Sequence, residues 1–184
     1  MGLEWRCDQG SSDVADKVMR FIDVGGHRPE RIKWLELFET SPPRSIIFMV
    51  ATSEYDQFAY RKGEVTNQNK IMESQELFDC VINHRDIPKV SIILFMNKTD
   101  LLREKISRVP ISDYFPKFVG RNDCLDDVQH FLVRMFLETA RNCNDLRPIY
   151  CHHTTAISTH NIRLVFENVC DSIWRENLII FDMM

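Results

Sequence analysis

Residues 23–34, DVGGHRPERIKW, combine a carboxylate, two adjacent glycines and an imidazole directly after an apolar run. A carboxylate at a strand end, here Asp23, can hold a magnesium ion through water, because this hard cation prefers oxygen ligands and keeps part of its hydration shell. A glycine, here Gly26, lets its backbone N–H approach a terminal phosphate. The stretch therefore predicts contacts to phosphate and magnesium, made by Asp23, Val24, Gly25 and Gly26.

A second polar motif, NKTD at residues 97–100, also follows an apolar run. Asp100 at a strand end can accept hydrogen bonds from the N1–H and the 2-amino group of guanine, whereas adenine offers neither and would leave a partly buried carboxylate unpaired. Asn97 can bond the base edge and brace the neighbouring loop. The aliphatic stem of Lys98 can lie across the ring with its ammonium group in water. This motif predicts selection of guanine.

A third motif, TTA at residues 154–156, completes the set. Ala156 can bring a backbone N–H to the base without obstruction by a side chain. Either of the first two motifs alone could be a turn, since Asn and Asp favour turns and glycine supplies unusual backbone angles. Because all three follow apolar runs in this order, they indicate one nucleotide pocket. The expected guanine-binding residues are Asn97, Lys98, Thr99, Asp100 and Ala156.

These motifs need a scaffold, and apolar runs of strand length alternate with helical patterns along the chain. The expected strands span residues 18–24, 45–51, 90–96 and 148–155. The two middle runs are continuously apolar, as strands buried on both faces are. The expected helices span residues 30–38, 68–83, 123–140 and from 158 or 159 to 178. The order predicts an α/β fold with a parallel sheet, whose ligands bind at the carboxyl ends of the strands.

The composition limits the classes of function. The chain carries 23 basic and 27 acidic residues, with no run of like charge that would mark a nucleic-acid arm or a polybasic membrane patch. No apolar run approaches transmembrane length, and the first 24 residues lack the apolar block of a signal peptide. We therefore expect a cytoplasmic protein that does not bind nucleic acid.

The six cysteines are scattered without a C-x-x-C pair, so free thiols are expected in a reducing compartment. Cys151, His152 and His153 are adjacent and could suggest metal ligands, but three consecutive side chains point in different directions. A strand end with polar side chains is the favoured interpretation.

Several stretches together resemble the heterotrimeric G-protein α subunits. DVGGHRPERIKW resembles the second switch of that family, DVGGQRxERxxW, and VATSEYDQ resembles the strand that enters its third switch. SIILFMNKTDLLREKI resembles the guanine-specificity strand and loop, and TTAISTHNIRLVF resembles the base-contacting loop and the last helix. The wording of NKTDLL, ISDYF and TTAISTHNIRLVF is most similar to the twelve/thirteen class. The resemblance covers the chain from about Phe21 to the C-terminus.

The resemblance implies a P-loop NTPase fold of the Ras-like type, with a parallel sheet and flanking helices, and a switch driven by GTP and GDP with Mg²⁺. The implied partners are a beta-gamma dimer, a G-protein-coupled receptor and an effector such as a Rho exchange factor. The implied location is the cytoplasm at the inner face of the plasma membrane, with only peripheral membrane contact. The receptor would engage the last helix at Phe181, Asp182, Met183 and Met184.

The chain departs from the family pattern around the phosphate. The motif G-x-x-x-x-G-K-[ST] does not occur in the sequence, and the helical insert domain and the first switch, with its arginine and threonine, are also missing. His27 stands where the family has a catalytic glutamine, and translational GTPases resemble the chain in having histidine there. The region 58–70 is longer and more basic than the acidic third switch of the family.

We therefore expect residues 21–184 to be the C-terminal part of a Ras-like domain that lacks the phosphate-loop strand, the helical insert domain and the first switch, headed by an unmatched segment at residues 1–20. The family activity is GTP hydrolysis, which this chain is not expected to perform alone without the phosphate loop and the arginine. The alternative is a noncatalytic fragment that competes for the receptor or the beta-gamma dimer. Binding of a guanine nucleotide distinguishes the two hypotheses.

Overall fold

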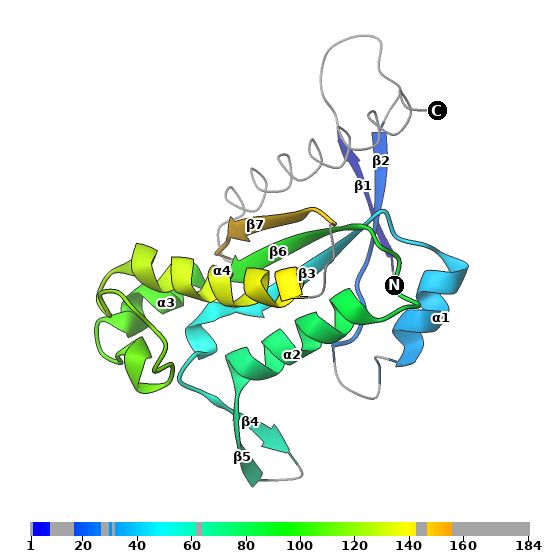
Figure 1. Cartoon of the computed structure of the whole chain (residues 1–184). Helices are drawn as coiled ribbons and strands as arrows, with labels where there is room; N and C mark the ends of the chain where they lie inside the picture. Colours follow the sequence, from blue (N-terminus) through cyan, green and yellow to red (C-terminus); the bar gives the residue numbers. More distant parts are fainter. Residues whose placement is uncertain are drawn as a thin grey trace. The chain divides into compact units, whose positions relative to one another are not determined.

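The computed structural model of the chain describes residues 2–7, 17–26, 30, 32–61, 64–142 and 147–155 (Figure 1). The chain forms two compact units, Met1–Pro42 and Pro43–Met184, and each is described by itself. In the part of the chain that the structure describes, no helix is long and apolar enough to cross a membrane.

The first unit contains a β-hairpin and one helix. Strand β1 (Gly2–Cys7) pairs antiparallel with β2 (Lys17–Ile22), in a register that runs from Gly2 opposite Ile22 to Cys7 opposite Lys17. An extended segment follows β2, and helix α1 (Ile32–Thr40) follows that segment. The expected strand at 18–24 and helix at 30–38 are thus both present, each displaced by one or two residues. Strand β1 was not expected from the sequence.

The second unit is built on a parallel three-stranded sheet with the order β3-β6-β7. Its strands are β3 (Ser45–Ala51), β6 (Ser91–Asn97) and β7 (Ile149–His153). Ser45 lies opposite Ser91 in one pairing, and Ile92 lies opposite Ile149 in the other. Residues 91–96 of the central strand are all buried, as the continuous apolar run predicted for a strand covered on both faces. The expected parallel α/β sheet is confirmed for the last three of its expected strands. The expected strand at 18–24 does not join it, because β2 pairs antiparallel with β1 instead.

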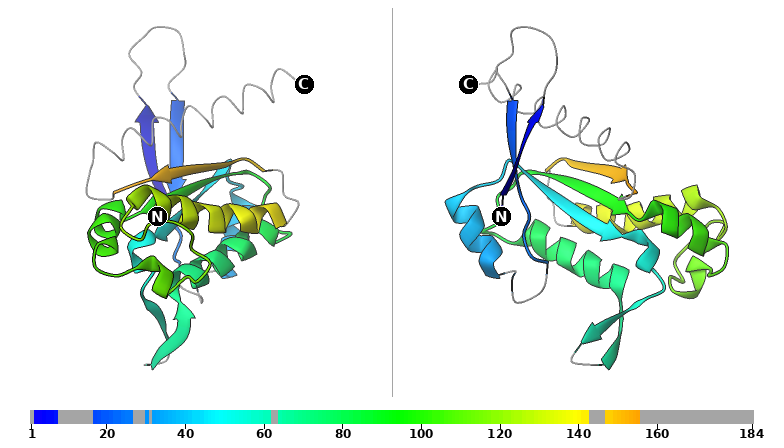
Figure 2. Two further views of the ribbon diagram at one scale, coloured as in Figure 1. Left: turned by 60° about the vertical axis from the view of Figure 1, so that its left-hand side comes forward. Right: turned by 180° about the vertical axis from the view of Figure 1, so that it is seen from behind.

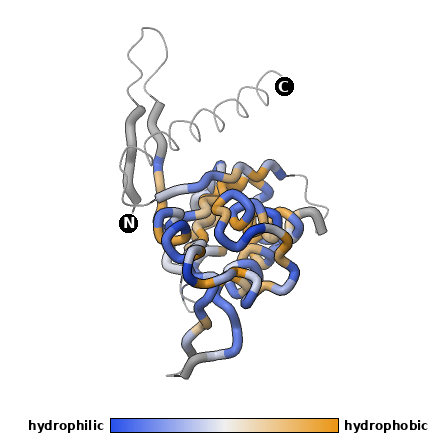
Figure 3. Tube along the Cα trace, turned by 90° about the vertical axis from the view of Figure 1, so that its left-hand side faces the viewer, coloured by the Kyte–Doolittle hydropathy of each residue, from blue (hydrophilic) through white to orange (hydrophobic). Residues whose placement is uncertain are grey.

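Two long helices, α2 (Lys70–Asn83) and α4 (Leu125–Asn142), lie side by side on one face of this sheet (Figures 1 and 2). The ring of Phe78 in α2 contacts Phe48 of β3 at a centroid distance of 5.1 Å and Phe136 of α4 at 5.5 Å, both edge to face. Phe78 and Phe136 are fully buried. The apolar stripes of both predicted helices therefore form core, and Figure 3 shows hydrophobic segments gathered in the body of this unit.

A short β-hairpin projects from the second unit between β3 and α2 (Figure 1). Strand β4 (Phe58–Arg61) pairs antiparallel with β5 (Glu64–Asn69), with a register shift between Phe58 and Tyr60. This hairpin occupies most of the region compared with the third switch, where no strands were expected. Asn69 ends it and begins α2, because its Oδ1 accepts the backbone N–H of Ile71 at 2.8 Å and of Met72 at 3.4 Å.

Helix α3 (Thr99–Ile106) was also not expected as a helix. It begins within the NKTD motif and buries Leu102 and Ile106. A 3-10 helix at Thr52–Glu54 follows β3 and lies close to α3, since Lys105 of α3 donates to the backbone oxygen of Ser53 at 2.7 Å. This placement brings the end of β3 toward the NKTD motif.

Candidate guanine-binding site

The carboxyl ends of β6 and β7 meet at one edge of the sheet. Because Met96 lies opposite His153, the residues that follow, Asn97 and Thr154, come out of the sheet together. The Thr154 N–H donates to Met96 O at 3.0 Å, and the Thr99 N–H donates to Thr154 O at 3.2 Å. The NKTD motif and the start of the TTA motif are therefore joined by backbone hydrogen bonds.

Asn97 braces this junction with its side chain and its carbonyl group. Its Oδ1 accepts the backbone N–H of Lys98 at 2.8 Å and the Thr154 hydroxyl at 3.2 Å. Its backbone oxygen accepts the Thr52 hydroxyl at 2.7 Å, which adds the end of β3 to the junction. With Thr154 and Thr52 both buried, these hydrogen bonds hold all three strand ends in one arrangement.

Lys98 occupies the left-handed region of backbone conformation, with φ 62° and ψ 37°. Within the described residues it is the one non-glycine residue with positive φ. A side chain in this region costs roughly 1–2 kcal/mol, and the hydrogen bonds of Asn97 on one side and Thr99 on the other hold the backbone there. The resulting sharp turn starts α3 directly after β6 and places Asp100 in the first turn of that helix.

Asp100 is half-exposed, and its side chain forms no hydrogen bond or ion pair with another residue in the described ranges. Its position in the first turn of α3 suits a negative charge, because the N-terminus of a helix carries a partial positive charge. The carboxylate is thus available to accept hydrogen bonds from a ligand at the rim formed by Asn97 and Thr154.

A carboxylate that was not expected from the sequence, Glu54, binds the lysine of the motif. Lys98 Nζ lies 2.8 Å from Glu54 Oε1, and Lys70 Nζ lies 3.3 Å from Glu54 Oε2. Burial alone would raise the pKa of Glu54, but the hydrogen bonds and charges of Lys98 and Lys70 outweigh this effect and lower the pKa below its ordinary value. Glu54 is therefore a charged partner of both lysines at neutral pH.

The residues predicted to bind phosphate lie in the first unit, directly after β2. Asp23, Val24, Gly25 and Gly26 are exposed there in an extended segment. Trp34 Nε1 of α1 donates to Gly25 O at 3.0 Å. A Cβ atom at Gly25 would collide with the carboxylate of Glu30, whereas a Cβ atom at Gly26 would meet nothing within 4 Å. Of the two glycines, Gly25 is thus the one at which an added methyl group would displace a neighbouring side chain.

The predicted magnesium ligand, Asp23, does not belong to a larger cluster of ligating side chains in the described residues. Among them, no group of three or more His, Cys, Asp or Glu side chains could hold a metal ion. Asp23 is an exposed carboxylate that could offer oxygen to a hydrated cation, but the further ligands would have to come from elsewhere. Cys151, His152 and His153 all belong to β7, so they lie at a strand end, as the sequence predicted.

Several predicted site residues lie outside the described residues. They are the residue in place of the family glutamine, the alanine of the TTA motif and the receptor-contact residues, namely His27, Ala156, Phe181, Asp182, Met183 and Met184. The last predicted helix, from 158 or 159 to 178, lies outside them as well.

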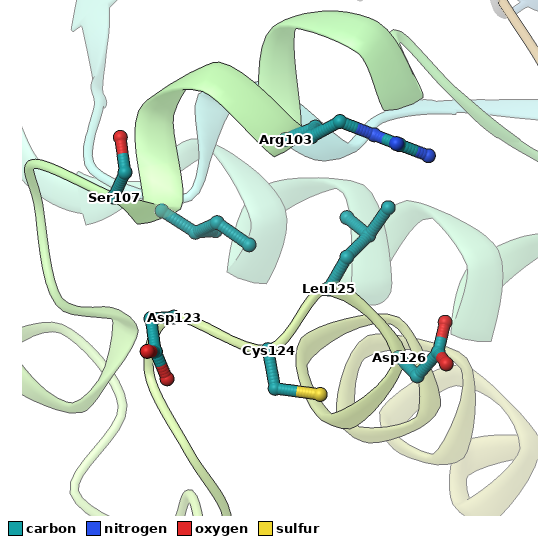
Figure 4. A pocket seen from close by; sticks show the side chains of 7 residues that line it. Arg103, Ser107, Asp123, Cys124, Leu125 and Asp126 are labelled. Atoms are coloured by element: carbon teal, nitrogen blue, oxygen red, sulfur yellow. The ribbon is translucent and has the colours of Figure 1, made fainter.

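A surface pocket of about 270 Å³ lies at the other end of α3, away from the NKTD motif (Figure 4). It is lined by Arg103 and Ser107 from the end of α3 and by Asp123, Cys124 and Asp126 from the start of α4, among others. Asn97 and Asp100 do not line it. The pocket is therefore separate from the candidate site.

A parallel sheet with flanking helices and an NKxD motif at the end of its central strand fit an α/β fold of the P-loop NTPase type. The family model described as G-protein alpha subunit matches residues 7–173. The chain belongs to the G-protein alpha subunit family. The match begins within residues 1–20, for which the sequence offered no motif.

Curated relatives agree with this family and with the twelve/thirteen class. The chain is 46% identical to "Guanine nucleotide-binding protein subunit alpha-13" of Mus musculus over 166 residues, which is 90% of this chain and 42% of the mouse protein. It is 46% identical to "Guanine nucleotide-binding protein alpha-12 subunit" of Caenorhabditis elegans over 159 residues, 86% of this chain and 43% of that protein. The chain spans about two fifths of the length of these relatives.

Proposed function

We propose that the ends of β6 and β7 form the guanine-recognition side of a GTP/GDP switch that relays signals from G-protein-coupled receptors. The observation that carries the proposal is the brace made by Asn97, whose Oδ1 accepts from both Lys98 and Thr154 and so holds the two loops together. The family membership supports the same function.

Guanine is the base whose chemistry matches this rim. The Asp100 carboxylate can accept two hydrogen bonds from the N1–H and the 2-amino group of guanine, and it has no competing partner among the described residues. Adenine has no donor at these positions, so it would leave the charge without a partner, which is costly for a partly buried group. We propose Asn97, Lys98, Thr99, Asp100 and Ala156 as the guanine-binding residues.

For the phosphates we propose Asp23, Val24, Gly25 and Gly26, with Asp23 bound to Mg²⁺ through water and His27 at the place of the family glutamine. Phosphoryl transfer depends on a phosphate cradle, a metal and a cationic residue. The sequence has no G-x-x-x-x-G-K-[ST] motif. We therefore propose that this chain alone binds guanine nucleotides feebly and hydrolyses GTP negligibly.

The partners and the location are proposals that rest on the family. They are a beta-gamma dimer, a G-protein-coupled receptor that engages Phe181–Met184 and an effector such as a Rho exchange factor, at the cytoplasmic face of the plasma membrane. Because the chain spans about two fifths of its curated relatives, these roles are proposed on the strength of family membership alone.

The test is a titration of the purified chain with fluorescent GDP, compared with ADP and xanthosine diphosphate as competitors. We expect GDP to compete and ADP not to. The Asp100→Asn chain should lose affinity for GDP and gain affinity for xanthosine diphosphate, because an amide can donate to the C2 carbonyl that replaces the 2-amino group. Glu104→Gln makes the same change of charge on an exposed position of the same helix and serves as the matched control. Equal competition by GDP and ADP would exclude guanine recognition.

A second candidate function is a noncatalytic fragment that competes with full-length subunits for the receptor or the beta-gamma dimer. The absence of the phosphate-loop motif from the sequence favours it. It predicts no detectable GDP binding together with inhibition of receptor-stimulated nucleotide exchange on a full-length subunit of the twelve/thirteen class. Detectable, guanine-selective binding would favour the first proposal.

A further inference from the structure

We propose that Glu54 is a positioning residue for guanine, because it holds the Lys98 side chain beside the base. Glu54 also links Lys98 to both ends of the β4–β5 hairpin, so the position of the hairpin and the occupancy of the guanine site influence each other. The proposal rests on the proposed function, because it concerns the same site. It adds a residue outside the NKTD motif and a route of regulation.

The two oxygens of Glu54 each bind a different lysine. Oε1 lies 2.8 Å from Lys98 Nζ in the NKTD motif, and Oε2 lies 3.3 Å from Lys70 Nζ at the start of α2. The Glu54 side chain is 24% exposed, against 40% for Lys98 and 36% for Lys70. A partly buried carboxylate with two cationic partners holds its geometry better than a solvated surface pair does.

The contact with Glu54 fixes the Lys98 side chain before a base is bound. The Lys98 backbone is already held in the left-handed conformation by Asn97 and Thr99. With the ammonium group tied to Glu54 as well, the aliphatic stem between them loses most of its rotamer freedom. A free lysine side chain has many rotamers, so a stem ordered in advance binds the flat face of a purine at a smaller entropic cost.

The second partner connects the same carboxylate to the hairpin. Lys70 follows β5 directly, and its Nζ also donates to Gln57 Oε1 at 2.9 Å, while its backbone N–H donates to Gln57 O at 2.9 Å. Gln57 precedes β4 directly. Both ends of the hairpin are therefore fastened at Lys70, and Lys70 is fastened to Glu54. A displacement of the hairpin base would move one partner of Glu54 and disturb the other.

Because binding free energies are linked, the influence must run in both directions. A change in the position of the hairpin base would change the affinity for guanine, and a bound guanine would favour one position of the hairpin base to the same extent. The hairpin projects from the second unit (Figure 1). Glu54 contacts both Lys98 in the NKTD motif and Lys70 directly after β5.

The test compares Glu54→Gln, Glu54→Asp and the matched control Asp56→Asn in the full chain. Asp56 belongs to the same segment and pairs with Lys105 at 2.7 Å, so its loss removes a neighbouring ion pair of similar burial without touching Lys98. The probe is fluorescent GDP at low ionic strength, and the second readout is the backbone amide NMR spectrum without nucleotide.

We expect Glu54→Gln to weaken GDP binding about fivefold, because a charge-assisted hydrogen bond that orders the site is lost and part of it is screened by solvent. Without nucleotide, the amide signals of Thr99 and Asp100 and those of Lys70 and Ile71 should shift together. Glu54→Asp should restore most of the GDP affinity and most of the wild-type amide signals. Asp56→Asn should leave the signals of Thr99 and Asp100 unshifted.

The outcomes separate the two proposals. If the wild-type chain does not bind GDP, the proposed function fails and the role of Glu54 fails with it. If the wild-type chain binds GDP and Glu54→Gln binds it equally well, the role of Glu54 alone is wrong. The same holds if Asp56→Asn weakens GDP binding as much as Glu54→Gln does, or if the signals of Lys70 and Ile71 stay unchanged in Glu54→Gln.

Discussion

The side chains of Thr154 and Asn97 form a hydrogen bond between the ends of two neighbouring parallel strands. The Thr154 hydroxyl donates to Asn97 Oδ1 at 3.2 Å, while the Thr154 backbone N–H donates to Met96 O at 3.0 Å. The side-chain bond is thus an addition to a backbone bond that already continues the pairing of β6 and β7. Asn97 and Thr154 belong to motifs that are 57 residues apart in sequence.

The first prediction concerns this hydrogen bond. Thr154→Val keeps the shape of the buried side chain but removes its hydroxyl, so it should lower the free energy of unfolding by about 1 kcal/mol. Urea denaturation measures this change, and Thr154→Ser, which keeps the hydroxyl, should lose less. A Thr154→Val chain as stable as the wild type would show that Asn97 gains nothing from the contact.

The second prediction concerns the dependence of stability on pH at Glu54. Lys98 and Lys70 lower the pKa of Glu54 in the folded chain. The contribution of Glu54 to the free energy of unfolding is therefore complete above the pKa that Glu54 has in the unfolded chain, and it is lost as the pH falls through the lower pKa of the folded chain. Urea denaturation between neutral and acidic pH should therefore give a steeper loss of stability for the wild type than for Glu54→Gln. Parallel curves for the two chains would contradict the prediction.

The third prediction concerns His153 at the end of β7. Burial lowers its pKa, and His130 and His152 add to this effect, while Asp126 opposes it. Folding therefore favours the neutral imidazole. The free energy of unfolding keeps the full contribution of His153 above the pKa that His153 has in the unfolded chain, and it falls as the pH drops through the pKa of His153 in the folded chain. His153→Gln should flatten the loss of stability below about pH 6.5, the ordinary value for histidine. A slope in His153→Gln equal to that of the wild type would contradict the prediction.

The fourth prediction separates the two glycines of the DVGG segment. Gly25→Ala would place a methyl group against the Glu30 carboxylate, which must move, so we expect a loss of about 1 kcal/mol, at the low end for overpacking because a carboxylate is the flexible end of its side chain. Gly26→Ala meets open space and should cost less. The indole N–H signal of Trp34, which bonds Gly25 O, should shift in Gly25→Ala only.

Strand β6 was predictable because burial on both faces requires an unbroken apolar run, and residues 91–96 are all buried. The apolar run 45–51 also forms a strand, β3, but the expected burial on both faces is wrong there, since Met49 is 58% exposed. The start of α2 was predicted within two residues from the helical spacing of its apolar residues. What these elements share is a signal contained within about ten neighbouring residues.

Strand β1 and the β4–β5 hairpin were not predicted. In β1, Leu3, Trp5 and Cys7 alternate with polar residues, which is a strand pattern, but no apolar run marks it and its antiparallel partner lies beyond a long connection. In the hairpin, FAYR and EVTNQN are short and mostly polar, so no apolar pattern marks either strand.

The residues of the NKTD motif were predictable as a candidate site, but their support was not. Nothing in the sequence around Glu54 distinguishes it from a solvated surface carboxylate. Its two lysines lie 16 and 44 positions further along the chain, and only the fold brings Lys70 and Lys98 to it. Contacts of this kind depend on the tertiary structure, and no local pattern records them.

Asn69 has a consequence beyond its two neighbours in sequence. Its Oδ1 caps the first turn of α2, while its Nδ2 donates to Tyr55 O at 2.6 Å, in the segment that precedes β4. One amide group thus serves the helix, the hairpin and the buried tyrosine at the same time. These parts should open as a single cooperative unit, so amide hydrogens at the hairpin base and in the first turn of α2 should exchange with solvent at a common free energy.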